Sequence, residues 1–86
     1  MKDLERQLKA LANRRRLAIL KYLKGKREAA VSEIAGVIKL SIKATSKHLN
    51  ILASVNIVES EQRSLRVFYR LSQDQNPAAK HILSIL

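Results

Sequence analysis

Four polar residues between positions 43 and 50 are spaced to share one side of a helix. They are Lys43, Ser46, Lys47 and Asn50. Because they recur at i, i+3, i+4 and i+7, they lie together on a helical surface. Ammonium groups pair with phosphates, whereas hydroxyl and amide groups bond to the edges of bases. This set predicts a helix that enters the major groove of double-stranded DNA.

The predicted contacts extend to the start and the flanks of the same helix. Ser41 is its predicted N-cap, and Ile42 can touch a thymine methyl group. For His48 two interpretations stay open: a phosphate contact, or a half-buried ring that bonds locally. The DNA contacts predicted on this segment are Ser41, Ile42, Lys43, Thr45, Ser46, Lys47, His48 and Asn50.

A shorter helix precedes this one, and together they predict a helix-turn-helix over about residues 32–54. Ser32 is the predicted N-cap of the first helix. The helical spacing of apolar residues breaks around Lys39 and Leu40, which places the turn there. A helix-turn-helix presents its second helix to the major groove, so the polar side described above would face DNA.

Alternating apolar and polar residues predict a β-hairpin over residues 57–71, with a basic connection between its strands. A hairpin that follows a recognition helix forms a wing. Arg63 and Arg66 lie at its tip and are predicted to reach the phosphate backbone or the minor groove. The alternative is an exposed turn whose charges only prevent pairing with another strand edge.

Two helices are predicted before the helix-turn-helix, at residues 3–12 and 14–24. Asn13 is the predicted N-cap of the second, and Gly25 suits a left-handed stop after it. Residues 26–30 predict a loop or a short extended piece. These helices supply leucine and isoleucine side chains for the core.

A last short helix is predicted over about residues 77–86, with Pro77 in its first turn. So short a helix cannot be stable alone, so it packs on the first helix, on a second copy of the chain, or on both. The predicted fold class is mainly α with a small β-hairpin: a winged helix-turn-helix with four helices, two strands and a final helix. The whole chain, residues 1–86, forms one domain.

Three consecutive arginines, Arg14, Arg15 and Arg16, begin the second predicted helix, which is the unfavourable end for cations. One interpretation is contact with phosphates. The other is a solvated surface with one arginine held in an ion pair, to Glu5 or Glu33. The sequence leaves both open.

Charge and composition narrow the partners. The chain has 17 Lys and Arg against 7 Asp and Glu, a formal net charge of +10, which favours nucleic acid. It has no cysteine, no glycine-rich phosphate loop and no isolated pair of carboxylates, so we expect neither an enzyme nor a cofactor. No apolar run is long enough to span a membrane, and the first residues are too charged for a secretory signal, so we expect a cytoplasmic protein.

Four local sequences, in the same order and spacing, resemble the ArsR-type winged helix-turn-helix transcriptional repressors. They are LKALANRRRLAIL at residues 8–20, LSIKATSKHLNIL at 40–52, NIV at 56–58 and VFYRL at 67–71. Arg16 matches the family arginine of the second helix, and residues 46–49 match the family quartet Ser-(Arg/Lys)-His-Leu. The resemblance covers nearly the whole chain.

The resemblance implies a homodimer that is built from the first and last helices and binds a palindromic operator. The predicted interface residues are Leu4, Leu8, Ala78, Ile82, Leu83 and Leu86. The Cys-x-Cys motif with which many family members sense metals is missing, and His81 alone cannot make a metal site. We therefore expect a dimeric DNA-binding repressor that needs no metal.

Two alternative functions stay open. The first is a ligand-responsive sensor with a site that the sequence does not reveal. The second is a winged helix used to bind a protein or RNA, which would tolerate loss of the polar side at Lys43, Ser46, Lys47 and Asn50.

Overall fold

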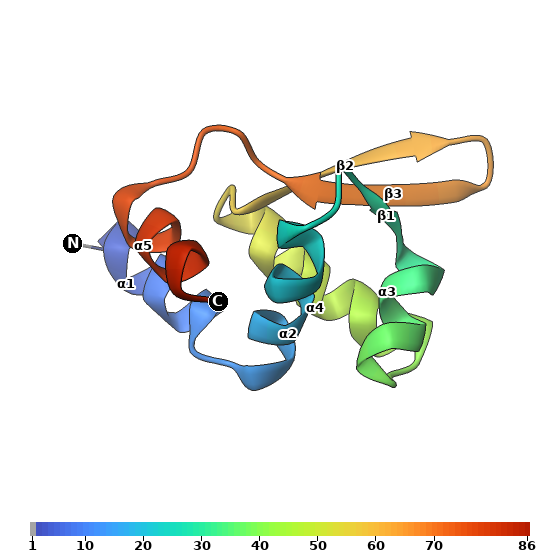
Figure 1. The fold of residues 1–86 in the computed structure, drawn as a ribbon, viewed down its shortest axis with the longest axis horizontal. Coiled ribbons are helices and arrows are strands. Elements are labelled where there is room, and N and C mark those ends of the chain that lie inside the picture. The colour runs from blue at the N-terminus through green and yellow to red at the C-terminus, as the bar shows by residue number, and fades with distance from the viewer. Residues whose placement is uncertain (1) are drawn as a thin grey trace.

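The helices are spread along the length of the molecule, and a long β-hairpin lies along one side of them and extends beyond them at one end (Figure 1). This computed structural model describes residues 2–86. The elements are α1 (Lys2–Leu11), α2 (Arg14–Lys24), β1 (Ala29–Ala30), α3 (Val31–Ile38), α4 (Ile42–Ser54), β2 (Val58–Arg63), β3 (Arg66–Leu71) and α5 (Pro77–Ile85). The predicted order of helices and hairpin is confirmed, and β1 is an addition to it.

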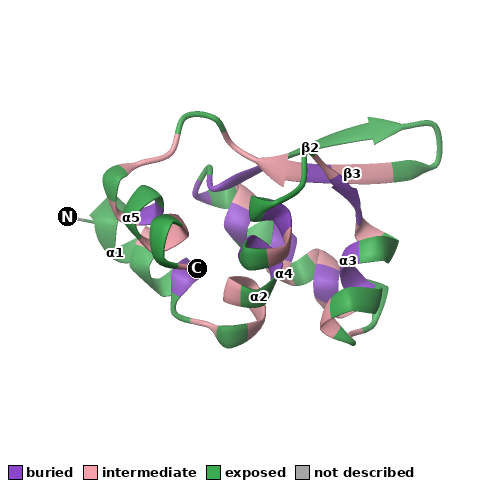
Figure 2. Cartoon of the chain, viewed as in Figure 1, coloured by how far each residue is buried: buried purple, intermediate pink, exposed green. Residues whose placement is uncertain are grey.

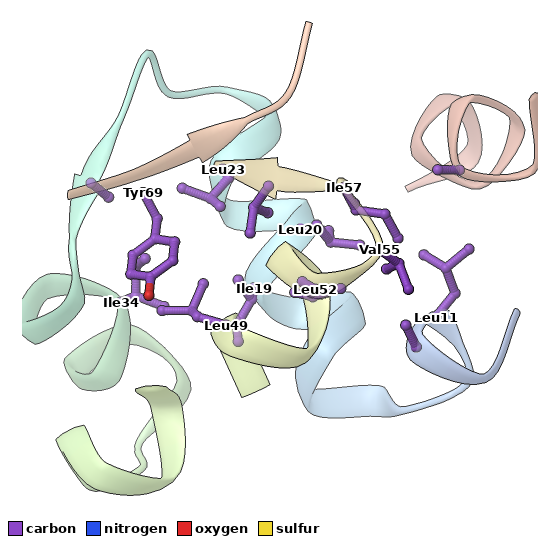
Figure 3. Packing of buried hydrophobic residues seen from close by; sticks show 14 residues of the cluster. Leu11, Ile19, Leu20, Leu23, Ile34, Leu49, Leu52, Val55, Ile57 and Tyr69 are labelled. Carbon is purple, nitrogen blue, oxygen red and sulfur yellow. The ribbon is translucent and has the colours of Figure 1, made fainter. Parts of the chain in front are cut away.

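Helix α2 lies at the centre of the core. Asn13 caps its start, because the Asn13 Oδ1 accepts from the backbone N–H groups of Arg15 and Arg16. Its side chains Ile19, Leu20 and Leu23 are fully buried. The buried cluster also holds Leu11 of α1, Leu49 and Leu52 of α4, Tyr69 of β3, and Ile57 between α4 and β2 (Figure 3). This shared core fixes α4 relative to the sheet.

The turn between α3 and α4 is short and has a left-handed residue. Lys39 ends α3 with φ 58°, and its N–H donates to the Ala35 carbonyl. Ser41 then caps α4, since its Oγ accepts from the N–H of Ala44 at 3.1 Å. The predicted break at Lys39 and the predicted Ser41 cap are confirmed.

Two predicted helix ends are wrong. Helix α3 begins at Val31 rather than after Ser32, and its cap residue Ala30 makes no side-chain hydrogen bond. The reason is long-range, because Ala29 and Ala30 pair with Tyr69 and Phe68 of β3, and the helix starts as this short strand ends. The predicted left-handed stop is also wrong, since Gly25 has φ −95°.

The sheet has the strand order β1-β3-β2, and all its pairs are antiparallel. Asn56, with φ 62°, provides a left-handed exit after α4. The hairpin closes at the Arg63–Arg66 pair, so Ser64 and Leu65 form the tip. Figure 2 shows that the far half of the hairpin is exposed, and Leu65 keeps 95% of its surface in solvent.

Helices α1 and α5 pack side by side at the other end of the molecule (Figure 1). Asn76 caps α5 by accepting from the N–H of Ala79 at 2.8 Å, and Pro77 occupies the first turn as predicted. Within residues 2–86, no helix has the length and apolarity that a membrane span requires.

Candidate nucleic-acid interface

The exposed side of α4 is cationic and polar. Lys43, Lys47 and Asn50 are exposed, and Ser46 is half-buried beside them. Neither α4 nor α2 contains an aspartate or glutamate. Within residues 2–86, neither lysine is within ion-pair distance of a carboxylate. Their charges are therefore available to an anionic partner.

A hollow separates the first turn of α4 from the wing, the β2–β3 hairpin. Ile42 and Ser46 line it on the helix side, and Leu65, Arg66 and Val67 line it on the wing side. Ile42 leaves 57% of its surface in solvent. Helix and wing thus border one concave surface, which is lined mostly by apolar groups and has Arg66 as its cation.

Thr45 faces the core. It is fully buried, in line with Leu49 and Leu52, and its hydroxyl has no hydrogen-bond partner within residues 2–86. The prediction that Thr45 contacts DNA is therefore wrong. Helical spacing alone does not decide whether a residue at the edge of the polar side faces solvent or the core. In the folded chain, packing places Thr45 in the core.

Asn50 is oriented by the sheet beneath it. The Tyr69 hydroxyl donates to the Asn50 Oδ1 at 3.3 Å. The Tyr69 side chain is mostly buried, and this burial raises the pKa of its hydroxyl, which keeps it a donor. Since the bond uses the amide oxygen, the NH₂ group of Asn50 is the end that remains to donate.

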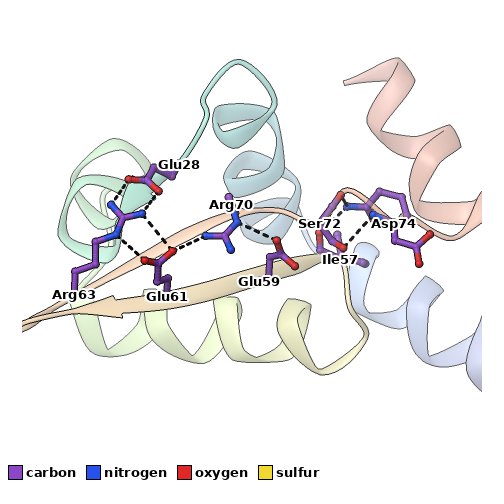
Figure 4. A network of polar contacts seen from close by, with 9 residues as sticks. Glu28, Ile57, Glu59, Glu61, Arg63, Arg70, Ser72 and Asp74 are labelled. Atoms are coloured by element: carbon purple, nitrogen blue, oxygen red, sulfur yellow. Dashed lines mark hydrogen bonds and ion pairs between the residues drawn. The ribbon is translucent and has the colours of Figure 1, made fainter.

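The two wing arginines differ in their surroundings. The Arg63 guanidinium donates to both Glu28 carboxylate oxygens, at 2.5 and 2.6 Å, and to Glu61 at 3.0 Å (Figure 4). These bonds lower the pKa of the Glu28 and Glu61 carboxyls and raise that of Arg63. Arg66, in contrast, has no ion pair within residues 2–86 and lies 5.0 Å from the centre of the Phe68 ring. Only Arg66 offers an uncompensated charge at the tip.

Arg16 contacts the recognition segment directly. Its Nη1 lies 3.2 Å from the His48 Nδ1, and its other donors reach backbone carbonyls of α1. Neither Glu5 nor Glu33 pairs with it. Glu33 instead accepts from the Tyr22 hydroxyl and pairs with Lys26. The structure therefore adds an arrangement that the sequence did not suggest, because the partner of Arg16 is 32 residues away.

The other two arginines of the run line a shallow hollow with the turn of the helix-turn-helix. Arg14 and Arg15, from the first turn of α2, border it together with Lys39. The charge of Arg15 is one cause of the lowered pKa of His48, after burial and the charge of Arg16.

Apolar residues remain exposed on α1 and α5. Leu4 and Leu8 of α1 are exposed, Leu8 to 48%, and Ile85 of α5 is exposed to 68%. The other predicted interface residues, Ala78, Ile82, Leu83 and Leu86, are half-buried, and the last three pack partly against the core. Ile85, which the sequence prediction omitted, is the most exposed apolar residue on this pair of helices.

Within the described residues, no group of three or more His, Asp or Glu side chains is close enough to hold a metal ion. His81 lies exposed on α5. The arrangement can bind anions and apolar surfaces.

Known proteins resemble this chain in sequence. Residues 11–61 match the model of a helix-turn-helix domain. The chain is 38% identical over 76 residues to the transcriptional activator HlyU of Vibrio cholerae, an alignment that covers 88% of this chain and 69% of HlyU. It is 30% identical over 79 residues to the HTH-type transcriptional regulator YgaV of Escherichia coli K12, covering 92% of this chain and 77% of YgaV.

Solved structures share the fold. The structure of HlyU from Vibrio cholerae superposes with a TM-score of 0.82 at 33% identity, over 98% of this chain and 87% of that one. The homodimeric winged helix-turn-helix DNA-binding domain Mb0332 of Mycobacterium bovis, a possible ArsR-family regulator, gives 0.82 at 31% identity, over 98% and 74%. These likenesses confirm the predicted fold class.

Proposed function

Because the chain belongs to the ArsR-type winged helix-turn-helix family of transcriptional regulators, we propose that it is a homodimeric repressor that binds a palindromic operator. The observation that carries this proposal is the cationic side of α4 beside the wing. Lysine, serine and asparagine groups are exposed there, with no carboxylate on the same helix. Residues 1–86 act as one DNA-binding domain, in the cytoplasm, without a cofactor or a metal.

The side chains divide into two roles. Lys43 and Lys47 bind backbone phosphates, because a lysine ammonium is a point charge without a rigid fork. Ser46 and the NH₂ group of Asn50 meet base edges, and Ile42 touches a thymine methyl. Arg66 extends the contact to the backbone beyond the groove. The Ser41 oxygen accepts the α4 cap bond, and its hydroxyl hydrogen remains to donate to DNA.

The dimer is built on α1 and α5. Leu4, Leu8 and Ile85 are apolar and exposed on two helices that pack together. The relative Mb0332 is a homodimer. A two-fold axis at this surface presents two α4 helices to successive major grooves, so the half-sites lie about one helical turn, roughly 10 base pairs, apart.

Repression follows from occupancy. A dimer bound over a promoter covers the DNA that the polymerase must contact. Repression of this kind needs only the DNA-binding surface of the protein. The relative HlyU is an activator, so the sense of regulation needs a test of its own. A reporter gene placed behind the selected operator decides the sense for this chain, with lower expression expected when the protein is present.

The test of DNA recognition is selection from a pool of random double-stranded DNA at near-physiological salt, followed by sequencing. We expect enrichment of a palindrome with half-sites about one turn apart. The matched control is the double variant K43A/K47A, which should retain little DNA and enrich no sequence.

Other outcomes contradict the proposal. Salt-sensitive retention without enrichment would mean a non-specific binder. Absence of retention would favour a module that binds a protein or RNA. Enrichment of single half-sites would contradict the homodimer.

A further inference from the structure

Arg16 is anchored to the end of α1. Its Nε donates to the Ala10 carbonyl at 2.6 Å, and its Nη2 donates to the Lys9 carbonyl at 3.2 Å. These carbonyls belong to the last turn of α1, where the helix leaves them without internal partners. The guanidinium is planar, so two anchored donors fix the direction of the third, Nη1. That donor lies 3.2 Å from the His48 Nδ1.

This contact determines which nitrogen of His48 carries the proton. An arginine guanidinium can only donate, so the His48 Nδ1 must accept. A ring whose Nδ1 accepts is neutral, and its single proton is on Nε2. The pKa of His48 is lowered by burial, then by the charges of Arg16 and Arg15, which also favours the neutral ring. Geometry and electrostatics therefore agree.

The Nε2–H group lies on the other side of the ring, away from Arg16. No hydrogen bond to Nε2 is present within residues 2–86, and the ring is only half-buried. His48 directly follows Lys47, a proposed phosphate contact, and lies on the flank of α4 that turns towards α1 and α2. A donor at this place has a DNA phosphate oxygen as its natural acceptor.

We propose that Arg16 is a positioning residue that holds His48 in the Nε2–H tautomer, so that His48 donates a hydrogen bond to the DNA backbone. The DNA part of this proposal rests on the proposed function. The tautomer part does not, because it concerns the protein alone. The two interpretations of His48 that the sequence left open are then both true, since Nδ1 bonds to Arg16 and Nε2 donates to the DNA backbone.

The same contact links two regions with different tasks. Arg16 holds the end of α1, the helix that carries Leu4 and Leu8, against the middle of α4. A lysine at position 16 would keep the charge but has one nitrogen, so it cannot hold both α1 carbonyls and the histidine in one fixed geometry. Arg16→Lys is therefore the informative substitution. Arg15→Lys is its matched control, because Arg15 is the neighbouring cation and makes no hydrogen bond to His48.

The first measurement is the pair of His48 ring ¹⁵N chemical shifts, from long-range ¹H–¹⁵N correlation spectra near pH 7.5 without DNA. We expect an unprotonated Nδ1 and a protonated Nε2 in the wild type and in Arg15→Lys. In Arg16→Lys we expect a mixture of tautomers. A protonated Nδ1 in the wild type, or tautomer populations that Arg16→Lys leaves unchanged, would overturn the proposal.

The second measurement is a double-mutant cycle on the dissociation constant for the selected operator at fixed salt. Arg16→Lys should weaken binding about tenfold, the size expected for one hydrogen bond to a charged group, whereas Arg15→Lys should stay within about twofold. In the His48→Ala background, Arg16→Lys should have no further effect, because Arg16 acts through His48. Equal effects in both backgrounds would show that Arg16 acts without His48.

The two measurements separate the possible failures. A wild type that shows the expected tautomer and binds no DNA would contradict the proposed function alone. A wild type that binds its operator with the wrong tautomer would contradict the role of Arg16 alone. Thermal unfolding followed by circular dichroism shows that each variant is folded at the temperature of the measurements.

Discussion

Arg63 and Glu28 form a two-pronged ion pair that ties the wing to the segment before β1. The arginine Nη1 and Nη2 lie 2.5 and 2.6 Å from the two carboxylate oxygens. The residues are 35 positions apart in sequence. The pair continues through Glu61 to Arg70 and Glu59 along the outer surface of the sheet (Figure 4). The wing is thereby held in one direction relative to the segment before β1.

This pairing predicts different roles for the two wing arginines in DNA binding. Each cation that meets a phosphate contributes about one unit to the slope of log K against log salt. We expect Arg66→Ala to reduce that slope by about one, and Arg63→Ala to reduce it by clearly less, because two carboxylates already compensate Arg63. Titrations of the operator at four or more salt concentrations measure both. Equal losses of slope would mean that Arg63 leaves Glu28 when DNA binds.

The lysines of α4 should each account for one phosphate. Lys43→Ala and Lys47→Ala should each reduce the salt slope by about one, since both ammonium groups are exposed and unpaired. Lys80→Ala is the control: Lys80 is equally exposed but lies on α5, so the slope should not change. Titrations of the operator at several salt concentrations measure these slopes as well. A slope that Lys43→Ala or Lys47→Ala leaves unaltered removes that lysine from the contact surface.

Dimer formation should depend on Leu8. Leu8→Glu places a charge on the proposed seam and removes an apolar contact twice in a symmetric dimer, so the dimer dissociation constant should rise about a hundredfold or more. Sedimentation equilibrium measures this. The matched control is Leu65→Glu at the wing tip, which is even more exposed and should leave the dimer intact. A Leu8→Glu chain that remains dimeric at low micromolar concentration would place the seam elsewhere.

The buried hydroxyl of Thr45 should lower stability. Since its Oγ1 has no partner within residues 2–86, replacing it with a methyl group of similar shape should raise the free energy of unfolding by about 1 kcal/mol. Chemical denaturation of Thr45→Val measures the change. Operator affinity should stay the same, because the side chain does not reach the surface. If Thr45→Val bound DNA more weakly, this would contradict the buried position of Thr45 and support the direct DNA contact that the sequence predicted.

Acidification should destabilise the fold through His48. The pKa of His48 is lowered from its usual 6.5 in the folded state, so the unfolded chain binds the proton more tightly. Its contribution to stability is therefore complete above about pH 6.5 and is lost as the pH falls below that value. Thermal unfolding between pH 7.5 and 5 should show this loss in the wild type and in His81→Gln. The loss should be absent in His48→Gln.

The lowered pKa values of Glu28 and Glu61 act in a different range. These carboxyls have an ordinary value of 4.5, so the stability from their bonds to Arg63 is lost only as the pH falls below about 4.5. A loss of stability between pH 7.5 and 5 that persists in His48→Gln would therefore come from neither His48 nor these carboxyls, and would contradict the assignment.

Local signals in the sequence predicted local structure well. Asn13, Ser41 and Pro77 each affect the backbone within a few residues, and each has the predicted role. Ser32 has the same chemistry as Ser41. It fails as a cap because the two alanines before α3 pair with β3, a contact that no local pattern contains.

The candidate site was harder to predict because its details depend on packing. The exposed positions of Lys43, Lys47 and Asn50 follow from helical spacing. The inward turn of Thr45, the compensation of Arg63 and the contact of Arg16 with His48 arise from segments far apart in the chain. The sequence also does not show which cations form ion pairs, because 17 basic residues share only seven acidic ones.

The distribution of these acidic residues affects how the molecule approaches DNA. Three of the seven carboxylates, those of Glu28, Glu59 and Glu61, lie on the outer surface of the sheet, while α2 and α4 have none. Arg63 and Arg70 pair with these three carboxylates, so that surface keeps little net charge, whereas Lys43 and Lys47 of α4 have no ion pair within residues 2–86. A DNA duplex therefore attracts α4 more strongly than the sheet, within about a Debye length, roughly 10 Å. Fewer collisions are then misoriented, and association is faster at low ionic strength.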